Sequence, residues 1–248
     1  YFETVDELTC SKRITVADAA IYREHPLAEP VAICDRDVDR ARALADKYGI
    51  PSVYGSVEEM LEAGGFDAVS IVTPDHLHAD IAVACAAAGK HLLIEKPLAT
   101  TSADVLRIVR AARESGVRVM VDLHNRWSPP FAEARRMVEE GGLGTLRNAY
   151  IRLNDVKWVA TDMLPWAARS SILWFLGSHS FDTLQWLFED RVRRVYTVSA
   201  RGVLDGLGVP TEDTFLSTLE FERGGVAQME NGWITPNANP CVNDIKCN

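Results

Sequence analysis

The amino-acid sequence predicts an α/β protein in which a parallel sheet is followed by an α+β domain with a mostly antiparallel, open sheet. Up to about residue 125, short apolar runs alternate with helical patterns, as in the repeated βα units of a doubly wound sheet. Beyond that point the strand patterns are longer and alternate between apolar and polar residues, which favours strands with one solvated face. We therefore expect two domains, over residues 1–124 and 125–248.

Short apolar strands and capped helices make up the first predicted domain. Its strands are expected over residues 31–35, 68–72, 92–94 and 117–121. Its helices are expected over residues 37–48, 76–88 and 101–115, and they end at Gly49, Gly89 and Gly116. A capping box at Ser56-Val57-Glu58-Glu59 opens one further short helix.

The second predicted domain begins with a helix over residues 128–140, which Gly141-Gly142 closes. Alternating strands are expected over residues 148–154, 192–201, 214–221 and 226–234. A hairpin turn at Glu222-Arg223-Gly224-Gly225 joins the last two strands, and one helix over residues 178–188 lies between the first two. The resulting sheet has one face that is free to meet a partner.

Composition and charge narrow the class of protein. The chain has 248 residues, 47% of them hydrophobic and 25% charged, which is enough apolar material for a sizeable core. The net charge of −9 does not support a nucleic-acid partner. Because no apolar run reaches transmembrane length and the first residues do not resemble a signal peptide, we expect a cytoplasmic protein without a membrane partner.

Cysteine and histidine spacing does not indicate a disulfide framework or a metal site. The cysteines number five, and no Cys-x-x-Cys occurs. We expect Cys34 and Cys85, which lie in apolar patterns, to be buried free thiols in a reducing compartment. Cys241 and Cys247 are isolated from histidines. His76 and His78 are two residues apart on a helix and do not face each other, so no metal site is expected.

The motif Glu95-Lys96-Pro97 follows the predicted strand at residues 92–94 directly. This order places a lysine at the carboxyl edge of a parallel sheet, where ligands bind in open α/β proteins. A lysine there can donate a proton or a hydrogen bond to a substrate oxygen. Lys96 is therefore a candidate catalytic residue, and the alternative is a surface lysine beside a proline that starts a helix.

A dinucleotide site would need an acid at a strand end and a glycine-rich turn about 20 residues before it. Asp35 ends its predicted strand and suits the role of the acid, although a turn or cap residue is the alternative. The corresponding glycine positions hold Cys10, Lys12 and Thr15. We therefore expect the first strand and the phosphate-binding turn to be missing or degenerate.

Six motifs occur in an order and at a spacing that resemble the Gfo/Idh/MocA oxidoreductases, which include glucose–fructose oxidoreductase and inositol dehydrogenase. They are Tyr22-Arg23-Glu24-His25-Pro26, Val31-Ala32-Ile33-Cys34-Asp35-Arg36-Asp37, Val72-Thr73-Pro74-Asp75-His76-Leu77-His78, Ala88-Gly89-Lys90-His91, Glu95-Lys96-Pro97 and Gly177-Ser178-His179-Ser180-Phe181-Asp182. The resemblance covers roughly residues 19–248. It implies an NAD(P)-binding Rossmann-like domain, a C-terminal domain for substrate and oligomerisation, and hydride transfer between NAD(P) and a hydroxyl carbon of a sugar, cyclitol or related polyol.

The resemblance also assigns roles to individual residues. It implies that the catalytic residues are Lys96 and His179. It implies cofactor contacts at Asp35, Arg36, Thr73, Pro74, His78, Glu95 and Lys96. It implies substrate contacts at Asn125, Arg126, Trp166, Arg169 and Asp182. NAD is favoured over NADP because the Asp35 carboxylate repels a 2′-phosphate, whereas Arg36 keeps NADP open. A homo-oligomer formed through the open C-terminal sheet is expected.

The proposed chemistry needs a base near the substrate hydroxyl and a donor for the developing charge. His179 is expected in the first turn of its helix, where the positive helix end disfavours imidazolium and leaves the ring able to act as a base. Lys96 would then hold or protonate the oxygen. A capping histidine is the alternative for His179.

Two departures from the family pattern keep other functions open. Many members have an aspartate four residues before the histidine, where this chain has Phe175. The chain also looks truncated at both ends. The alternatives are a non-catalytic regulatory protein that binds a dinucleotide or a sugar, and a redox-neutral lyase or epimerase that uses NAD.

Overall fold

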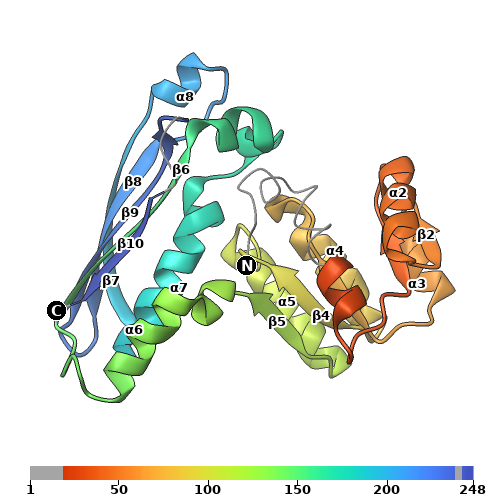
Figure 1. Cartoon of the computed structure of the whole chain (residues 1–248), viewed down its shortest axis with the longest axis horizontal. Coiled ribbons are helices and arrows are strands. Elements are labelled where there is room, and N and C mark those ends of the chain that lie inside the picture. The colour runs from red at the N-terminus through yellow and green to blue at the C-terminus, as the bar shows by residue number, and fades with distance from the viewer. Residues whose placement is uncertain (1–18, 238–241, 248) are drawn as a thin grey trace. The chain divides into compact units, whose positions relative to one another are not determined.

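The computed structural model describes residues 19–237 and 242–247 (Figure 1). The chain divides after Val121 into two compact units. The predictions for the first strand and the glycine-rich turn, together with those for Cys10 and Cys241, lie outside the described residues.

Parallel pairing is present in the first unit, as the sequence predicts. Strand β1 (Ala32–Cys34) pairs in parallel with β2 (Ser52–Tyr54), and β3 (Ala68–Ile71) pairs in parallel with β4 (His91–Glu95). Strand β5 (Val119–Asp122) lies beside β4. Within the described residues these strands form a two-stranded and a three-stranded sheet. The short strand β2 was not predicted.

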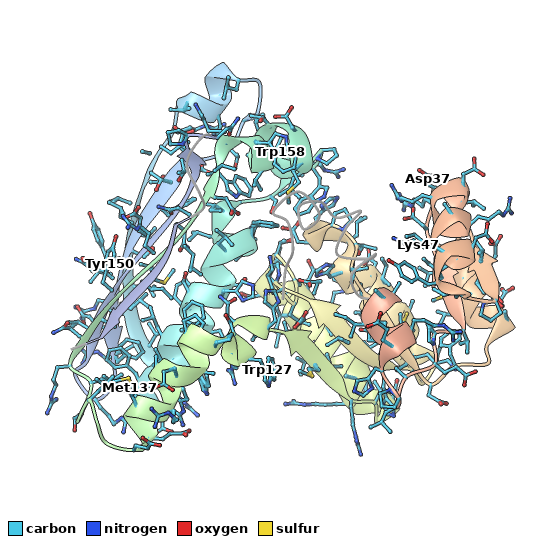
Figure 2. The ribbon with its side chains drawn as sticks, in the orientation of Figure 1. Asp37, Lys47, Trp127, Met137, Tyr150 and Trp158 are labelled. Atoms are coloured by element: carbon cyan, nitrogen blue, oxygen red, sulfur yellow. The ribbon has the colours of Figure 1, made fainter. Side chains whose placement is uncertain are left out.

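Local capping bonds explain where the helices of the first unit begin and end. These helices are α2 (Val38–Tyr48), α3 (Val57–Ala63), α4 (His78–Ala87) and α5 (Ser102–Ser115). At the starts of α2, α3 and α5, the side chains of Asp37, Ser56 and Thr101 each accept a backbone N–H from the residue three positions on. Figure 2 shows Asp37 and Lys47 at opposite ends of α2.

Left-handed glycines end two of these helices, as the sequence predicts. Gly49 (φ 66°) follows α2 and Gly116 (φ 68°) follows α5. Helix α4 differs from its prediction because it starts at His78, after a 3₁₀ turn over Asp75–Leu77.

Cys34 and Cys85 are free thiols. Cys85 is buried, as expected, whereas Cys34 is only half-buried. Burial raises the pKa of both thiols to about 11, and nearby acidic groups add to the effect. Both sulfurs are therefore protonated near neutral pH and are poor nucleophiles.

A five-stranded mixed sheet forms the second unit, with the order β10-β6-β9-β8-β7. Its strands are β6 (Asn148–Val156), β7 (Val192–Ala200), β8 (Thr214–Phe221), β9 (Val226–Thr235) and β10 (Val242–Cys247). Strands β6 and β9 are parallel and the other neighbouring pairs are antiparallel, which confirms a mostly antiparallel sheet. A short helix, α8 (Val203–Gly206), lies between β7 and β8.

Two helices cover one face of this sheet, and no described helix covers the other (Figure 1). Helix α6 (Pro129–Glu139) contributes Phe131 to the core, and α7 (Ser178–Phe188) contributes Leu184 and Leu187. They pack with the strand residues that alternate toward them, such as Ile151, Leu153, Leu219, Phe221 and Met229. Figure 2 shows Tyr150 on the uncovered face.

The β8–β9 hairpin packs tightly against α7 at Gly225. A Cβ atom at this position would lie 2.6 Å from Cε1 of Phe188. The Phe188 ring has little freedom to move because it stacks on Phe221 with the ring centroids 4.2 Å apart. We expect Gly225→Ala to lower the free energy of unfolding by about 2 kcal/mol through overpacking, measured by urea denaturation.

Gly206→Ala is the matched control for this prediction. An added Cβ at Gly206 meets no atom within 4 Å, so the change in unfolding free energy should stay within about 0.5 kcal/mol. An equal loss of unfolding free energy in Gly225→Ala and Gly206→Ala would show that the contact with Phe188 does not cause the destabilisation.

None of the helices in the described parts of the chain combines the length and the apolar character that crossing a bilayer requires.

Candidate active site

Lys96 is the first residue after β4, and it is buried with 9% of its surface exposed. Its backbone N–H donates to Oε2 of Glu95, at 3.1 Å. The position at the carboxyl end of a parallel strand agrees with the prediction. A buried ammonium group at this edge can bind an oxygen more strongly than one in water, because the surrounding dielectric is low.

His78 ties together the two loops beside Lys96. Its ring is 1% exposed and lies between two backbone carbonyl oxygens, with Nδ1 2.8 Å from that of Pro97 and Nε2 2.9 Å from that of Thr73. Thr73 follows β3 and Pro97 follows β4. The structure thus brings Thr73, His78 and Lys96 together, with His78 bonded to the backbone of both loops.

Asp35 lies directly after β1, as predicted, but its carboxylate already has a strong partner. Arg40 donates from Nε to Oδ2 at 2.8 Å and from Nη2 to Oδ1 at 2.5 Å. The backbone N–H of Asp37 also donates to Oδ1, at 2.9 Å. Arg36 is exposed beside them. Arg40 was not predicted to contact Asp35, and its position in the first turn of α2 was the available signal.

His179 lies on α7, buried with 3% of its surface exposed. His179 is the second residue of α7 and lies in its first turn, as expected. The turn that precedes α7 was not predicted. A π-helical turn over Leu173–Gly177 leads directly into α7, and Gly177 and Ser178 both have right-handed helical backbone. The preceding turn occupies the positive helix end, so the helix dipole does not explain a neutral imidazole at His179.

Two contacts place the 3₁₀ turn over His124–Trp127 against α7. The rings of His124 and His179 meet edge to face, with centroids 4.5 Å apart. Arg126 donates two hydrogen bonds to Asp182, at 2.7 and 2.6 Å. The guanidinium of Arg126 also lies over the ring of Trp186. The hydrogen bonds to Asp182 raise the pKa of Arg126, so the guanidinium of Arg126 keeps its charge over the whole physiological range.

The remaining predicted substrate residues occupy two turns of the second unit. Asn125 is half-buried in the same 3₁₀ turn as Arg126. Trp166 is half-buried and Arg169 is exposed, and both belong to the short turn around Ala167–Arg169. Pro74 and Glu95, predicted cofactor contacts, are half-buried in the first unit.

Asn231 supports the start of α7 and was not recognised in the sequence. Its side chain is fully buried, and Nδ2 donates to the carbonyl of Leu153 and to Oγ of Ser180, each at 3.1 Å. Asn231 lies on β9, so these two bonds connect the residue after His179 to β9 and, through Leu153, to β6. Phe175, which replaces the aspartate of many family members, lies 6.0 Å from Trp233 between ring centroids and contributes to aromatic packing.

Two family profiles match the chain in sequence. The profile described as an oxidoreductase family with an NAD-binding Rossmann fold matches residues 13–123, and the Gfo/Idh/MocA C-terminal domain profile matches residues 131–247. The chain belongs to the Gfo/Idh/MocA oxidoreductase family. The family resemblance and the fold predicted from the sequence are both confirmed.

Curated Gfo/Idh/MocA relatives are similar over most of the chain. Inositol 2-dehydrogenase 1 of Saccharopolyspora erythraea is 33% identical over 82% of the chain and 59% of its own length. D-xylose 1-dehydrogenase (NADP(+)) 2 of Haloferax volcanii is 32% identical over 90% of the chain and 66% of its own length. The chain thus spans about three fifths to two thirds of the length of these relatives.

A solved structure of the same fold is the WlbA dehydrogenase of Bordetella pertussis, in complex with NADH and UDP-GlcNAcA. It is 26% identical, with a TM-score of 0.85, over 95% of this Gfo/Idh/MocA chain and 73% of the WlbA chain.

Proposed function

We propose that this protein is an NAD(P)-dependent oxidoreductase that transfers hydride between a nicotinamide cofactor and a hydroxyl-bearing carbon of a sugar, cyclitol or related polyol. The observation that carries the proposal is the buried Lys96 at the carboxyl end of β4, in a chain of the Gfo/Idh/MocA family. Relatives named as inositol and xylose dehydrogenases support the substrate class.

The described residues of the first unit suit a dinucleotide cofactor. Asp35 presents a carboxylate at a strand end, and Thr73 and Lys96 occupy loops at the carboxyl ends of β3 and β4. The nicotinamide would supply the hydride chemistry. The chain would supply Lys96, which holds or protonates the substrate oxygen, and His179, which takes the hydroxyl proton.

The substrate residues form part of this proposal. Asn125, Trp166 and Arg169 would contact substrate hydroxyls from turns of the second unit. Arg126 and Asp182 bond to each other, and each retains hydrogen-bonding positions for a hydroxyl group because a carboxylate accepts about four bonds and a guanidinium donates five.

A first experiment measures cofactor binding and then turnover. Purified protein is titrated with NADH and NADPH while energy transfer from its tryptophans is followed. It is then incubated with oxidised cofactor and a panel of sugars and cyclitols while formation of reduced nicotinamide is recorded. Net cofactor reduction supports the dehydrogenase.

Other outcomes favour the rival functions. Product formation without net reduction would identify a redox-neutral lyase or epimerase. Saturable binding without any product would favour a regulatory protein, in line with the packing role of Phe175.

Arg40 is expected to set the preference between NAD and NADP. Arg40 bonds both carboxylate oxygens of Asp35 and so offsets the negative charge that repels a 2′-phosphate. It also places a guanidinium where the 2′-phosphate of NADP would lie. We expect Arg40→Ala to weaken binding of 2′,5′-ADP about tenfold, the loss of a single charged hydrogen bond, while binding of 5′-AMP changes little. Calorimetric titration measures both.

Arg42→Ala, on the exposed side of the same helix, is the control for Arg40→Ala and should bind both nucleotides like the parent. If Arg36→Ala weakens 2′,5′-ADP binding and Arg40→Ala does not, the 2′-phosphate determinant is Arg36 instead.

We also propose a cytoplasmic homo-oligomer, formed through the uncovered face of the five-stranded sheet. Protonated, unpaired thiols at Cys34 and Cys85 suit a reducing compartment. On the uncovered face, Val198 pairs with Leu216 and Tyr196 pairs with Thr218 across β7 and β8. Exposed fractions of 46%, 52% and 67% for Val198, Leu216 and Tyr196 make this face apolar enough to associate.

Leu216→Glu is expected to lower the mass in solution to that of one chain, because it places a charge in the apolar face. Sedimentation equilibrium measures the mass. Leu106→Glu is a matched control, because Leu106 on α5 is also 52% exposed but lies in the other unit. The proposed interface is wrong if both variants retain the parent mass or if both dissociate.

A further inference from the structure

The His78 ring meets more acceptors than a neutral imidazole can satisfy. Two carbonyl oxygens lie within hydrogen-bond distance of its two nitrogens, at 2.8 and 2.9 Å. A neutral ring has one N–H, so it can donate to one carbonyl and must direct a lone pair at the other. Only the imidazolium donates to both.

Burial favours the neutral form of the ring. The charged groups that act on it are Asp75, in the 3₁₀ turn before α4, and Lys96, after β4. Burial lowers the pKa of His78 below its usual 6.5, and Lys96 lowers it further, against the opposing effects of the two carbonyls and Asp75. At neutral pH the ring therefore has a single proton to donate.

The free-energy cost of leaving a carbonyl without this hydrogen bond differs between Pro97 and Thr73. The contact with Pro97 is buried, whereas the contact with Thr73 is only partly buried. A carbonyl that water can reach finds another donor, but a buried one that is left unpaired costs about 1–3 kcal/mol. The proton is therefore more stabilising on Nδ1, where it faces Pro97.

We propose that neutral His78 carries its proton on Nδ1 and, by donating it to the carbonyl of Pro97, acts as the positioning residue for Lys96. Pro97 is bonded directly to Lys96, so fixing its carbonyl fixes the backbone from which the lysine side chain extends. The bond from Lys96 N–H to Glu95 holds the other side of the same residue. The consequence for turnover rests on the proposed function, whereas the hydrogen bond itself does not.

The wild-type ring is examined first, by long-range ¹H–¹⁵N correlation spectra of the chain labelled with ¹⁵N-histidine. The expected spectrum at neutral pH is that of a neutral ring protonated on Nδ1. A ring protonated on Nε2, or a ring protonated on both nitrogens, would overturn the proposal. This measurement requires neither cofactor nor turnover.

Two variants then separate the two contacts. In His78→Asn the amide nitrogen takes the place of Nδ1 and can still donate to Pro97. In His78→Gln the amide nitrogen takes the place of Nε2 and can donate only to Thr73. Reductive methylation followed by mass spectrometry reports how freely the amine of Lys96 reacts, and Lys90, whose amine bonds the Phe66 carbonyl, serves as internal reference.

We expect Lys96 of His78→Gln to be methylated several-fold faster than in the parent, and His78→Asn to restore the parent rate. In an active preparation kcat should fall by up to about 100-fold in His78→Gln, the cost of a misplaced catalytic group, with KM for cofactor little changed and partial recovery in His78→Asn. Equal labelling of Lys96 in parent and Gln variant would overturn the positioning role. If the protein proves inactive, the spectra and the labelling rates still test the positioning role of His78.

The pH dependence of stability provides another readout. Because the pKa of His78 is lower in the folded protein, the unfolded chain binds more protons between that pKa and about 6.5. The contribution of His78 to stability is therefore complete above pH 6.5 and falls as the pH is lowered through that range. Comparing urea denaturation of the parent and His78→Asn at several pH values should show this loss in the parent only.

Discussion

Replacing Lys96 by methionine should reduce kcat/KM by about 10²–10⁴-fold, the range typical of losing a positioned proton donor. Methionine keeps the length and the apolar stem, so the buried position should tolerate it and the fold should persist. What disappears is the ammonium group at the carboxyl end of β4. Steady-state kinetics with the best substrate of the polyol panel measures the effect.

The pattern of loss separates catalysis from folding. Binding of NADH should fall much less than turnover, because several other residues also contact the cofactor in the proposed site, whereas the proton donor to the substrate oxygen is lost. Lys96→Arg should not restore turnover, since a planar guanidinium cannot occupy the position of a compact ammonium that donates a proton. Lys90→Met, which removes another amine anchored in the first unit, is the control and should retain turnover. Full activity of Lys96→Met would remove Lys96 from the mechanism.

The sequence predicts most reliably those features whose cause is local. Asp37, Ser56 and Thr101 accept backbone N–H groups three residues on, and Gly49 and Gly116 adopt left-handed conformations. Each of these interactions lies within one turn of helix, so residue type and spacing suffice to predict it. The lysine after β4 is predictable in the same way, because strand end and motif are adjacent in the chain.

Contacts between residues far apart in the sequence, and helical turns of irregular geometry, could not be predicted from local residue patterns. The pair Arg126–Asp182 joins residues 56 positions apart, and the bond from Asn231 to Ser180 spans 51. No sequence period marks such pairs. The π-helical turn over Leu173–Gly177 also escapes a search for a 3.6-residue period, and π-helical turns often occur near functional sites. Because this turn runs directly into α7, helical backbone precedes Ser178, and the first turn that holds His179 is not an open helix N-terminus.

His179→Asn should lower kcat by about 10²–10⁴-fold, if the buried imidazole takes the hydroxyl proton. A base must be neutral to accept a proton. The parent should therefore lose alcohol-oxidation rate as the pH falls through the range in which the imidazole becomes protonated. In the Asn variant, which cannot take up that proton, the fall at acid pH should be absent. The rate is measured across pH at saturating substrate and cofactor.

His124 makes this test specific. Its exposed ring lies 4.5 Å from that of His179, so a second imidazole could produce the same fall in rate. If His179 is the base, His124→Asn keeps the acid-side fall and only His179→Asn removes it. If His124→Asn removes the fall instead, the exposed ring is the base, and His179 supports it from the core of α7. A rate that does not vary with pH in the parent would exclude both rings as the base.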